Sequence, residues 1–282
     1  MKRPQWIAAG VALVLVISLY AATRNQIFGI RPLQPLRTQA IPEEASFSVD
    51  SILLPAKQHL SPEQVTRLEL LEHSISRGDV RNQQLQVYEQ LARFWKDTAR
   101  AFAPYAWYTA EAARLENSEK SLTFAAHLFL DNLANEEKPP LRQWEALQAK
   151  DLFERSLKLN PGNDSSKVGL GAVYLYGGVA TPMQGIGMIR EVAERDSTNV
   201  YAQMTLGQAS VASGQFDKAI ERFQRVVRMQ PANLEAILML ADVYEQMGNK
   251  AEAVKWYGKS LPFIKNAALK GEVEARIAEL KK

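Results

Sequence analysis

The stretch that decides the fold is LGQASVASGQFDKAIERFQRVVRMQP, residues 206–231. It contains no Cys and no His, and it has no glycine-rich loop of the kind that cradles a phosphate. Its small and apolar residues nevertheless recur three and four positions apart, which places them on one face of a helix. This regular spacing predicts helix packing and indicates no reaction chemistry in the stretch.

The same pattern returns further along the chain. A shift of 34 residues superimposes the small and apolar positions of the stretch on later ones: Leu206 on Leu240, Gly207 on Ala241, Gly214 on Gly248, Ala219 on Ala253 and Phe223 on Tyr257. Five matches at one shift indicate an internal repeat. From residue 61 to the end, alternating runs of β-branched residues are almost absent, so we expect an all-α body.

The repeat resembles the unit of the tetratricopeptide repeat (TPR) family, a helix, turn and helix of 34 residues. The opening stretch carries five of the residues that the family favours: Leu206, Gly207, Ala219, Phe223 and Pro231. Ser210 stands where the family has tyrosine. The resemblance implies a TPR-type α-solenoid of antiparallel helix pairs.

Glycine and alanine at these positions have a packing role. Gly207 and Ala219 are expected to let the two helices of a unit approach closely, while Phe223 fills the space toward the next unit. Gly185 and Gly187, in the stretch QGIGMI, follow no strand, so close helix packing is expected there as well.

The repeat register extends from the opening stretch in both directions. In the following unit, residues 234–267, Pro262 comes earlier than the family pattern, so the second helix is expected to end early. In the preceding unit, residues 164–199, Thr181 and Pro182 are expected to restart a helix after a longer loop, as N-cap and first residue. Matching positions further back extend the predicted TPR solenoid over residues 140–267: Ala149, Phe153 and Pro161.

Residues 61–139 are expected to form degenerate helical hairpins. A helix start is predicted at Ser61 and Pro62, with Gln64 completing a capping box. The segment 104–130 resembles one repeat with a shortened turn, and residues 62–98 resemble another hairpin. At the other end, residues 268–282 are expected to form a C-terminal capping helix after an N-cap at Asn266, with an apolar stripe of Val273, Ile277 and Leu280.

Residues 1–23 are predicted to hold a single N-terminal transmembrane helix. Residues 4–23 carry no charge, and a helix of that length spans about 30 Å, the thickness of a bilayer core. Trp6 and Tyr20 lie near its ends, where aromatic rings favour the headgroup level. A cleaved signal peptide is the alternative, although the apolar run is long and Tyr20 fits poorly before a cleavage site.

The charges around this helix favour a cytoplasmic N-terminus. Lys2 and Arg3 precede it, so the bulk of the chain is expected on the exported side. In a bacterium this is a single-pass protein of the inner membrane with a periplasmic body.

Residues 24–60, which contain four prolines, are expected to form a linker. The alternative is that a short segment of this region docks against the first helices: Ile52, Leu53 and Leu54.

Composition argues against several functional classes. The formal net charge is +3, with 34 basic and 31 acidic residues interleaved, which does not favour nucleic acid. The absence of Cys removes disulfides, thiolate nucleophiles and Cys-based zinc sites. The histidines are His59, His73 and His127; Glu69 and His73 share a helix face, but no third metal ligand accompanies them. We therefore expect a noncatalytic protein with no cofactor, metal or small-molecule substrate.

The TPR resemblance implies where a partner would bind, because family members use exposed positions of the first helix of each unit. Carried over to this chain, the groove residues are Val168, Leu175, Tyr176, Tyr201, Met204, Gln208, Val211, Leu238, Asp242 and Glu245. This groove begins apolar and aromatic and becomes acidic toward the C-terminus. It lacks the Lys, Arg and Asn with which related clamps hold acidic chaperone tails.

These features together predict a membrane-anchored adaptor or assembly factor, which holds a protein or peptide partner on the periplasmic side. Proteins of this layout are similar to factors of secretion and envelope biogenesis. The alternative is a permanent structural subunit of a larger membrane protein complex.

Overall fold

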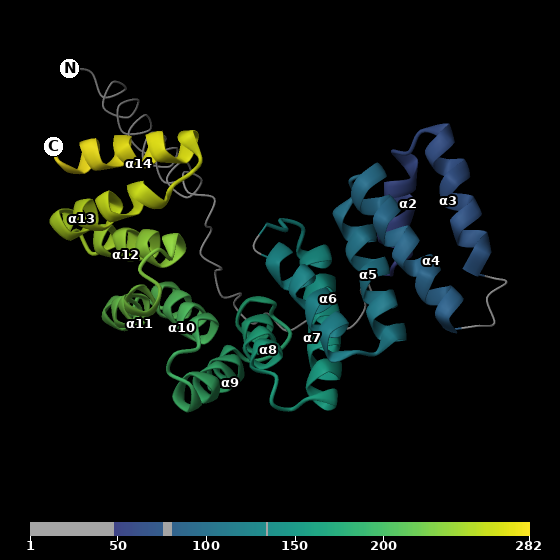
Figure 1. The fold of residues 1–282 in the computed structure, drawn as a ribbon, viewed down its shortest axis with the longest axis horizontal. Coiled ribbons are helices and arrows are strands. Elements are labelled where there is room, and N and C mark those ends of the chain that lie inside the picture. Colours follow the sequence, from purple (N-terminus) through teal and green to yellow (C-terminus); the bar gives the residue numbers. More distant parts are fainter. Residues whose placement is uncertain (1–47, 76–80, 134) are drawn as a thin grey trace, which may run out of the picture. The chain divides into compact units, whose positions relative to one another are not determined.

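The computed structural model describes residues 48–75, 81–133 and 135–282 (Figure 1). Every regular element within these ranges is a helix, which confirms the all-α prediction. The chain separates into two compact units at the boundary between Leu206 and Gly207. We call residues 48–206 the N-terminal unit and residues 207–282 the C-terminal unit.

The N-terminal unit runs from α2 into the first part of α10. Its helices are α2 (Asp50–Gln58), α3 (Pro62–Ile75), α4 (Arg81–Arg93), the π-helical turn η1 (Phe94–Thr98), α5 (Phe102–Glu116), α6 (Glu119–Asn132), α7 (Pro139–Leu159), α8 (Asp164–Tyr176), α9 (Pro182–Arg195) and the first part of α10 (Val200–Ala212). The neighbours that pack most extensively are α4 with α5, α6 with α7, and α8 with α9. The antiparallel helix pair predicted from the repeat is therefore the building block of this unit.

Two predicted helix starts are confirmed. The Ser61 amide donates to Gln64 Oε1 at 2.9 Å and the Gln64 amide donates to Ser61 Oγ at 3.3 Å, which is the reciprocal capping box. Helix α9 begins at Pro182 after Thr181, in a second capping box. Both signals are local in sequence, so they needed no knowledge of the rest of the fold.

The linker prediction was wrong for its last part. Residues 50–58 form helix α2, in which Ile52 is buried and Leu53 packs against a core formed by α3, α4, η1 and α5. Lys57 also pairs with Glu72 of α3 at 2.8 Å. The docking alternative therefore holds for Ile52 and Leu53, whose aliphatic side chains contact the apolar surface of the neighbouring helices. Residues 24–47 lie outside the described residues.

The helix pairing around residues 104–139 also differs from the sequence interpretation. Segment 104–130 was expected to be one hairpin, but α5 packs chiefly with α4, and α6 packs chiefly with α7. Trp144 of α7 explains this preference in part, since its ring lies 5.4 Å from Phe129 of α6. The hairpin α6–α7 thus crosses the boundary expected at residue 139, and α6 is the first helix of its pair.

Glycines allow the closest helix approaches in this unit. A Cβ at Gly185 would lie 2.3 Å from the backbone oxygen of Gly171, and a Cβ at Gly169 would lie 2.3 Å from the Phe153 ring. The packing role predicted for Gly185 is confirmed. Gly187 differs, since no atom lies within 4 Å of the Cβ that it lacks, so packing does not require glycine there.

The C-terminal unit contains the end of α10, α11 (Phe216–Met229), α12 (Leu234–Gln246), α13 (Lys250–Ser260), the short 3-10 turn η2 (Leu261–Phe263) and α14 (Ala267–Leu280). A Cβ at Gly207 would lie 2.4 Å from the Phe223 ring, as the close-approach argument predicts. Helix α13 ends at Ser260, just before Pro262, which confirms the early end. Asn266 caps α14 through its side chain, and Val273 of that helix is buried.

Within the described ranges, no helix is both long enough and apolar enough to span a bilayer. The predicted transmembrane helix, residues 4–23, lies outside those ranges.

Candidate partner-binding surface

Half of the predicted groove is closed by packing. Val168, Leu175 and Tyr176 of α8 are buried, as are Met204 and Leu238: none of the five exceeds 7% exposure. A partner cannot reach these side chains without displacing a neighbouring helix. The groove prediction is therefore corrected at these positions, because neighbouring helices cover residues that the family pattern assigns to an open face.

Three other predicted residues are partly exposed. Tyr201 lies beside His127, with ring centroids 5.5 Å apart, and burial raises the pKa of the Tyr201 hydroxyl. Gln208 donates to Glu235 Oε1 at 3.0 Å. Val211 is also partly exposed. The role of these three residues in binding stays a prediction.

The acidic end of the predicted groove has an internal function. The Tyr257 hydroxyl of α13 donates to Asp242 Oδ1 at 2.5 Å and lies 3.1 Å from Glu245 Oε2. Arg276 of α14 donates from Nε to the same Glu245 oxygen at 3.0 Å and pairs through Nη2 with the other oxygen. Burial and the two carboxylates together raise the pKa of Tyr257. Glu245 therefore joins the capping helix α14 to α12, while Asp242 bonds α13, and neither contact was predicted from the sequence.

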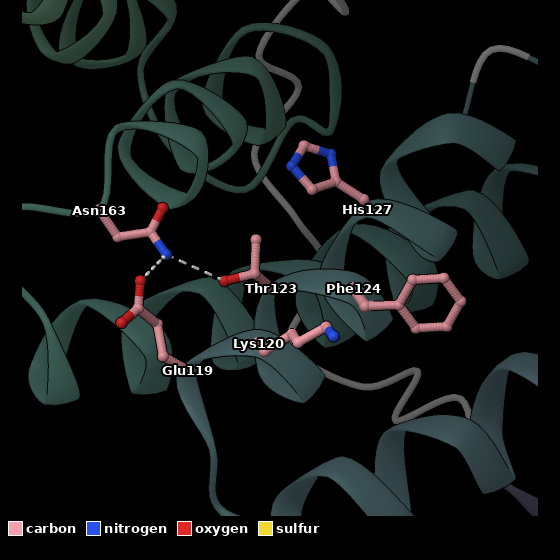
Figure 2. A pocket seen from close by; sticks show the side chains of 6 residues that line it. All are labelled: Glu119, Lys120, Thr123, Phe124, His127 and Asn163. Atoms are coloured by element: carbon pink, nitrogen blue, oxygen red, sulfur yellow. Dashed lines mark hydrogen bonds between the residues drawn. The ribbon is translucent and has the colours of Figure 1, made fainter.

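A hollow of about 550 Å³ opens elsewhere, between α6 and the start of α8 in the N-terminal unit. Figure 2 shows the side chains that line it: Glu119, Lys120, Thr123, Phe124, His127 and Asn163. Five of them lie on α6 at spacings of one, three and four residues, which gathers them on one face of that helix. The hollow is thus a surface of a first helix, as a TPR-type groove requires.

One wall of the hollow is held by hydrogen bonds. Asn163 Nδ2 donates to Glu119 Oε1 at 2.5 Å and to Thr123 Oγ1 at 3.2 Å, the contacts drawn in Figure 2. Behind them, Thr123 shares hydrogen bonds of 2.9 and 2.8 Å with the buried hydroxyls of Ser156 and Ser166. Since these bonds join α6, α7 and α8, this wall is preorganised.

His127 lies between aromatic rings from two other helices. Its ring makes an edge contact with Phe153 at 5.1 Å and a tilted contact with Tyr201 at 5.5 Å, and Nε2 lies 2.9 Å from Ser165 Oγ. Burial lowers the pKa of the imidazole, against the opposing influence of Asp131. His127 therefore contributes a neutral, fixed ring to the hollow near pH 7.

Phe124 is a large apolar side chain of this surface, and 57% of it is exposed. A large exposed aromatic ring at the rim of a hollow is typical of binding surfaces. Phe124 is absent from the groove predicted from the sequence, because treating segment 104–130 as one hairpin makes α6 a second helix. The repeat pattern does contain a signal for this pairing. Ala149 and Phe153 of α7 match second-helix positions of the repeat, so the helix before α7, which is α6, is the first helix of that pair.

The described residues offer little for metal or redox chemistry. They contain no group of three or more His, Asp or Glu side chains placed to hold a metal ion. The Nδ1 atom of His73 lies 2.7 Å from the Glu69 backbone oxygen.

Comparisons with known proteins agree with this architecture. Residues 210–270 match the family model described as tetratricopeptide repeat. A tetratricopeptide repeat protein from Parabacteroides merdae ATCC 43184 shares 14% identity over 82% of this chain and 86% of its own, with a TM-score of 0.55, which shows a common fold.

Two further structures resemble the chain less closely. MamA from Desulfovibrio magneticus RS-1 is 21% identical over 66% of this chain and 96% of its own, with a TM-score of 0.44. PilW, described as a type IV pilus biogenesis factor, is 18% identical over 69% of this chain and 92% of its own, with a TM-score of 0.48. No curated protein matches the sequence.

Proposed function

We propose that this chain is a scaffold for protein–protein interaction, as its match to the tetratricopeptide repeat model over residues 210–270 suggests, and that it holds a protein partner on the α6 face of its N-terminal unit. The observation that carries the proposal is the exposed Phe124 ring beside a preorganised hollow. A noncatalytic scaffold needs accessible apolar area on a rigid support, and α6 combines both.

The site of crosslinking tests this proposal. A photo-crosslinking amino acid at position 124 is expected to trap one partner in cells, while the same group at Met183 traps none. Met183 is a suitable control because it is also apolar and 69% exposed, but lies on α9. Equal trapping from both positions, or trapping only from Met183, would remove the α6 face as the binding surface.

The same experiment separates an adaptor from a permanent subunit. If the protein is an adaptor, partner molecules that are not crosslinked dissociate during purification, because the contact area is small. A permanent subunit purifies in a fixed ratio with its partner before any crosslinking. The small hollow favours the adaptor, so we expect weak, exchangeable binding.

The proposal includes an anchor at residues 4–23 and a periplasmic body. Its support is the length of the uncharged run and the two charges that precede it. Fusing a reporter after Lys282 tests the topology, and we expect activity only from a reporter that requires export. Activity of a cytoplasm-only reporter would overturn the periplasmic assignment while leaving the binding surface untouched.

A further inference from the structure

A second hollow lies on the other side of Phe124. It has a volume of about 310 Å³ and is lined by residues of α4, α5 and α6: Glu89, Ala92, Arg93, Thr109, Ala112, Ala113, Glu116, Ser121 and Phe124. Phe124 therefore forms a wall that the two hollows share, and a bound segment that crosses α6 would meet its ring from both sides.

The floor of this second hollow is made of methyl groups. Ala92, Ala112 and Ala113 are between 2% and 9% exposed. Small residues at these positions leave room that a large side chain would fill, and burying apolar area there is favourable. The floor therefore fits one bulky apolar side chain beside the Phe124 ring.

The charges at the rim set a preference for the neighbouring residue. Arg93 pairs with Glu89 at 3.8 Å within α4, so these two charges largely offset each other. Glu116 is an exposed carboxylate at the end of α5, on the rim of the same hollow. This leaves a net negative rim, which attracts a cationic side chain and repels an anionic one.

We propose that the segment held on the α6 face carries a bulky apolar side chain, seated over the alanine floor against Phe124, next to a Lys or Arg that meets Glu116. This inference rests on the proposed function and adds the chemistry of the partner to it. The apolar anchor supplies most of the affinity, and the charge pair supplies the selection between segments.

Binding of two short fluorescent peptides to the full chain in detergent micelles tests the inference. One probe carries a Trp flanked by Arg, and the other carries the same Trp flanked by Glu. The unaltered chain is expected to bind the Arg probe at least about tenfold more tightly.

Variants of the chain locate the two interactions. Phe124→Ala is expected to weaken binding of the Arg probe by at least about tenfold. Glu116→Lys is expected to weaken the Arg probe and to strengthen the Glu probe. Phe263→Ala is the matched control, since Phe263 is also an exposed phenylalanine but lies in the C-terminal unit. All three side chains are exposed, so circular dichroism should show an unchanged fold.

The inference is overturned if the unaltered chain binds both probes equally or neither of them. It is also overturned if Phe124→Ala and Glu116→Lys bind the probes as the control does. If these results occur while crosslinking from position 124 still traps a partner, the proposed function stands and only the partner chemistry is wrong. If position 124 traps nothing, the proposed function itself fails.

Discussion

At the residue scale, the glycines differ in what they do. A Cβ at Gly207 would lie 2.4 Å from the Phe223 ring, whereas Gly187 has no atom within 4 Å of that position. Packing therefore requires glycine at position 207 but not at position 187.

Alanine at the two positions should shift stability in opposite directions. We expect Gly207→Ala to lower the free energy of unfolding by about 1 to 3 kcal/mol, because the new methyl group overpacks the site. Gly187→Ala should raise it by about 0.5 to 1 kcal/mol, because alanine favours an exposed helix. Urea titration measures both changes. A stabilising Gly207→Ala would contradict the close-approach argument.

Glu145 is a buried carboxyl within α7. It is 0% exposed, and Asn132 Nδ2 lies 2.9 and 3.1 Å from its two oxygens. Burial raises the pKa of Glu145 from 4.5 to about 8, although the hydrogen bond from Asn132 opposes the shift. The folded state thus keeps a proton that the unfolded state releases near pH 4.5.

This shift predicts a specific dependence of stability on pH. Between pH 4.5 and about 8 the folded state binds more protons at Glu145 than the unfolded state, so the contribution of this group to stability falls as pH rises. Glu145→Gln should remove that fall, which makes the curve of unfolding free energy against pH flatter over this window. The measurement is urea unfolding from pH 5 to pH 8.

Glu194→Gln provides the control for this pH series, because Glu194 is exposed on α9. It should leave the slope unchanged. Any slope from His127, whose lowered pKa acts in the opposite direction, is common to all three proteins and cancels in the comparison. Parallel curves for the unaltered chain and Glu145→Gln would show that Glu145 is ionised in the folded protein.

At the scale of the element, α14 is held by a polar network as well as by Val273. Arg276 and Glu245 are 10% and 12% exposed, and their ion pair joins α14 to α12. Arg276 also pairs with Glu279, which is 54% exposed. Arg276 thus pairs with one mostly buried carboxylate, Glu245, and with one exposed carboxylate, Glu279.

Arg276→Met should cost about 2 to 4 kcal/mol, because it leaves the partly buried Glu245 carboxylate without its cation. Glu279→Gln should cost less than about 1 kcal/mol, since exposed pairs contribute little. Amide hydrogen exchange of α14 measures both effects. Equal protection of α14 in the two variants would show that the apolar contact of Val273 is sufficient to hold this helix.

The elements themselves were largely predictable because their signals are local. The caps at Ser61, Thr181 and Asn266 depend on residues two or three positions away, and Pro262 ends α13 through its own ring. The assignment of α6 to a pair was not predictable in this way. It depends on contacts between helices, such as the one between the rings of Phe129 and Trp144, whose centroids lie 5.4 Å apart.

At the scale of the whole molecule, stacked repeats contact mainly their neighbours, so damage should stay local. Phe223 is 0% exposed in the C-terminal unit. Phe223→Ala should lower local stability by about 3 to 5 kcal/mol, the usual cost of a large cavity. Hydrogen exchange should show lost protection in α11 and α12, with α4 to α7 unchanged.

Phe263→Ala is the control for this experiment, because the Phe263 ring is 38% exposed and leaves no enclosed cavity. It should alter protection only near η2. If Phe223→Ala instead lowered protection throughout the N-terminal unit, the two units would unfold as one cooperative block, and the nearest-neighbour description would be wrong.

The repeat period, the helical class, four helix ends and the residues that pack within a unit follow from the sequence alone. These properties follow from contacts between residues close in the chain. The tertiary structure was needed to show that Val168 and Tyr176 are covered, that Glu245 joins α14 to α12, and that Phe124 is open. Each of these depends on side chains from other helices, since the exposure of a helix face is set by its neighbours and not by its own spacing.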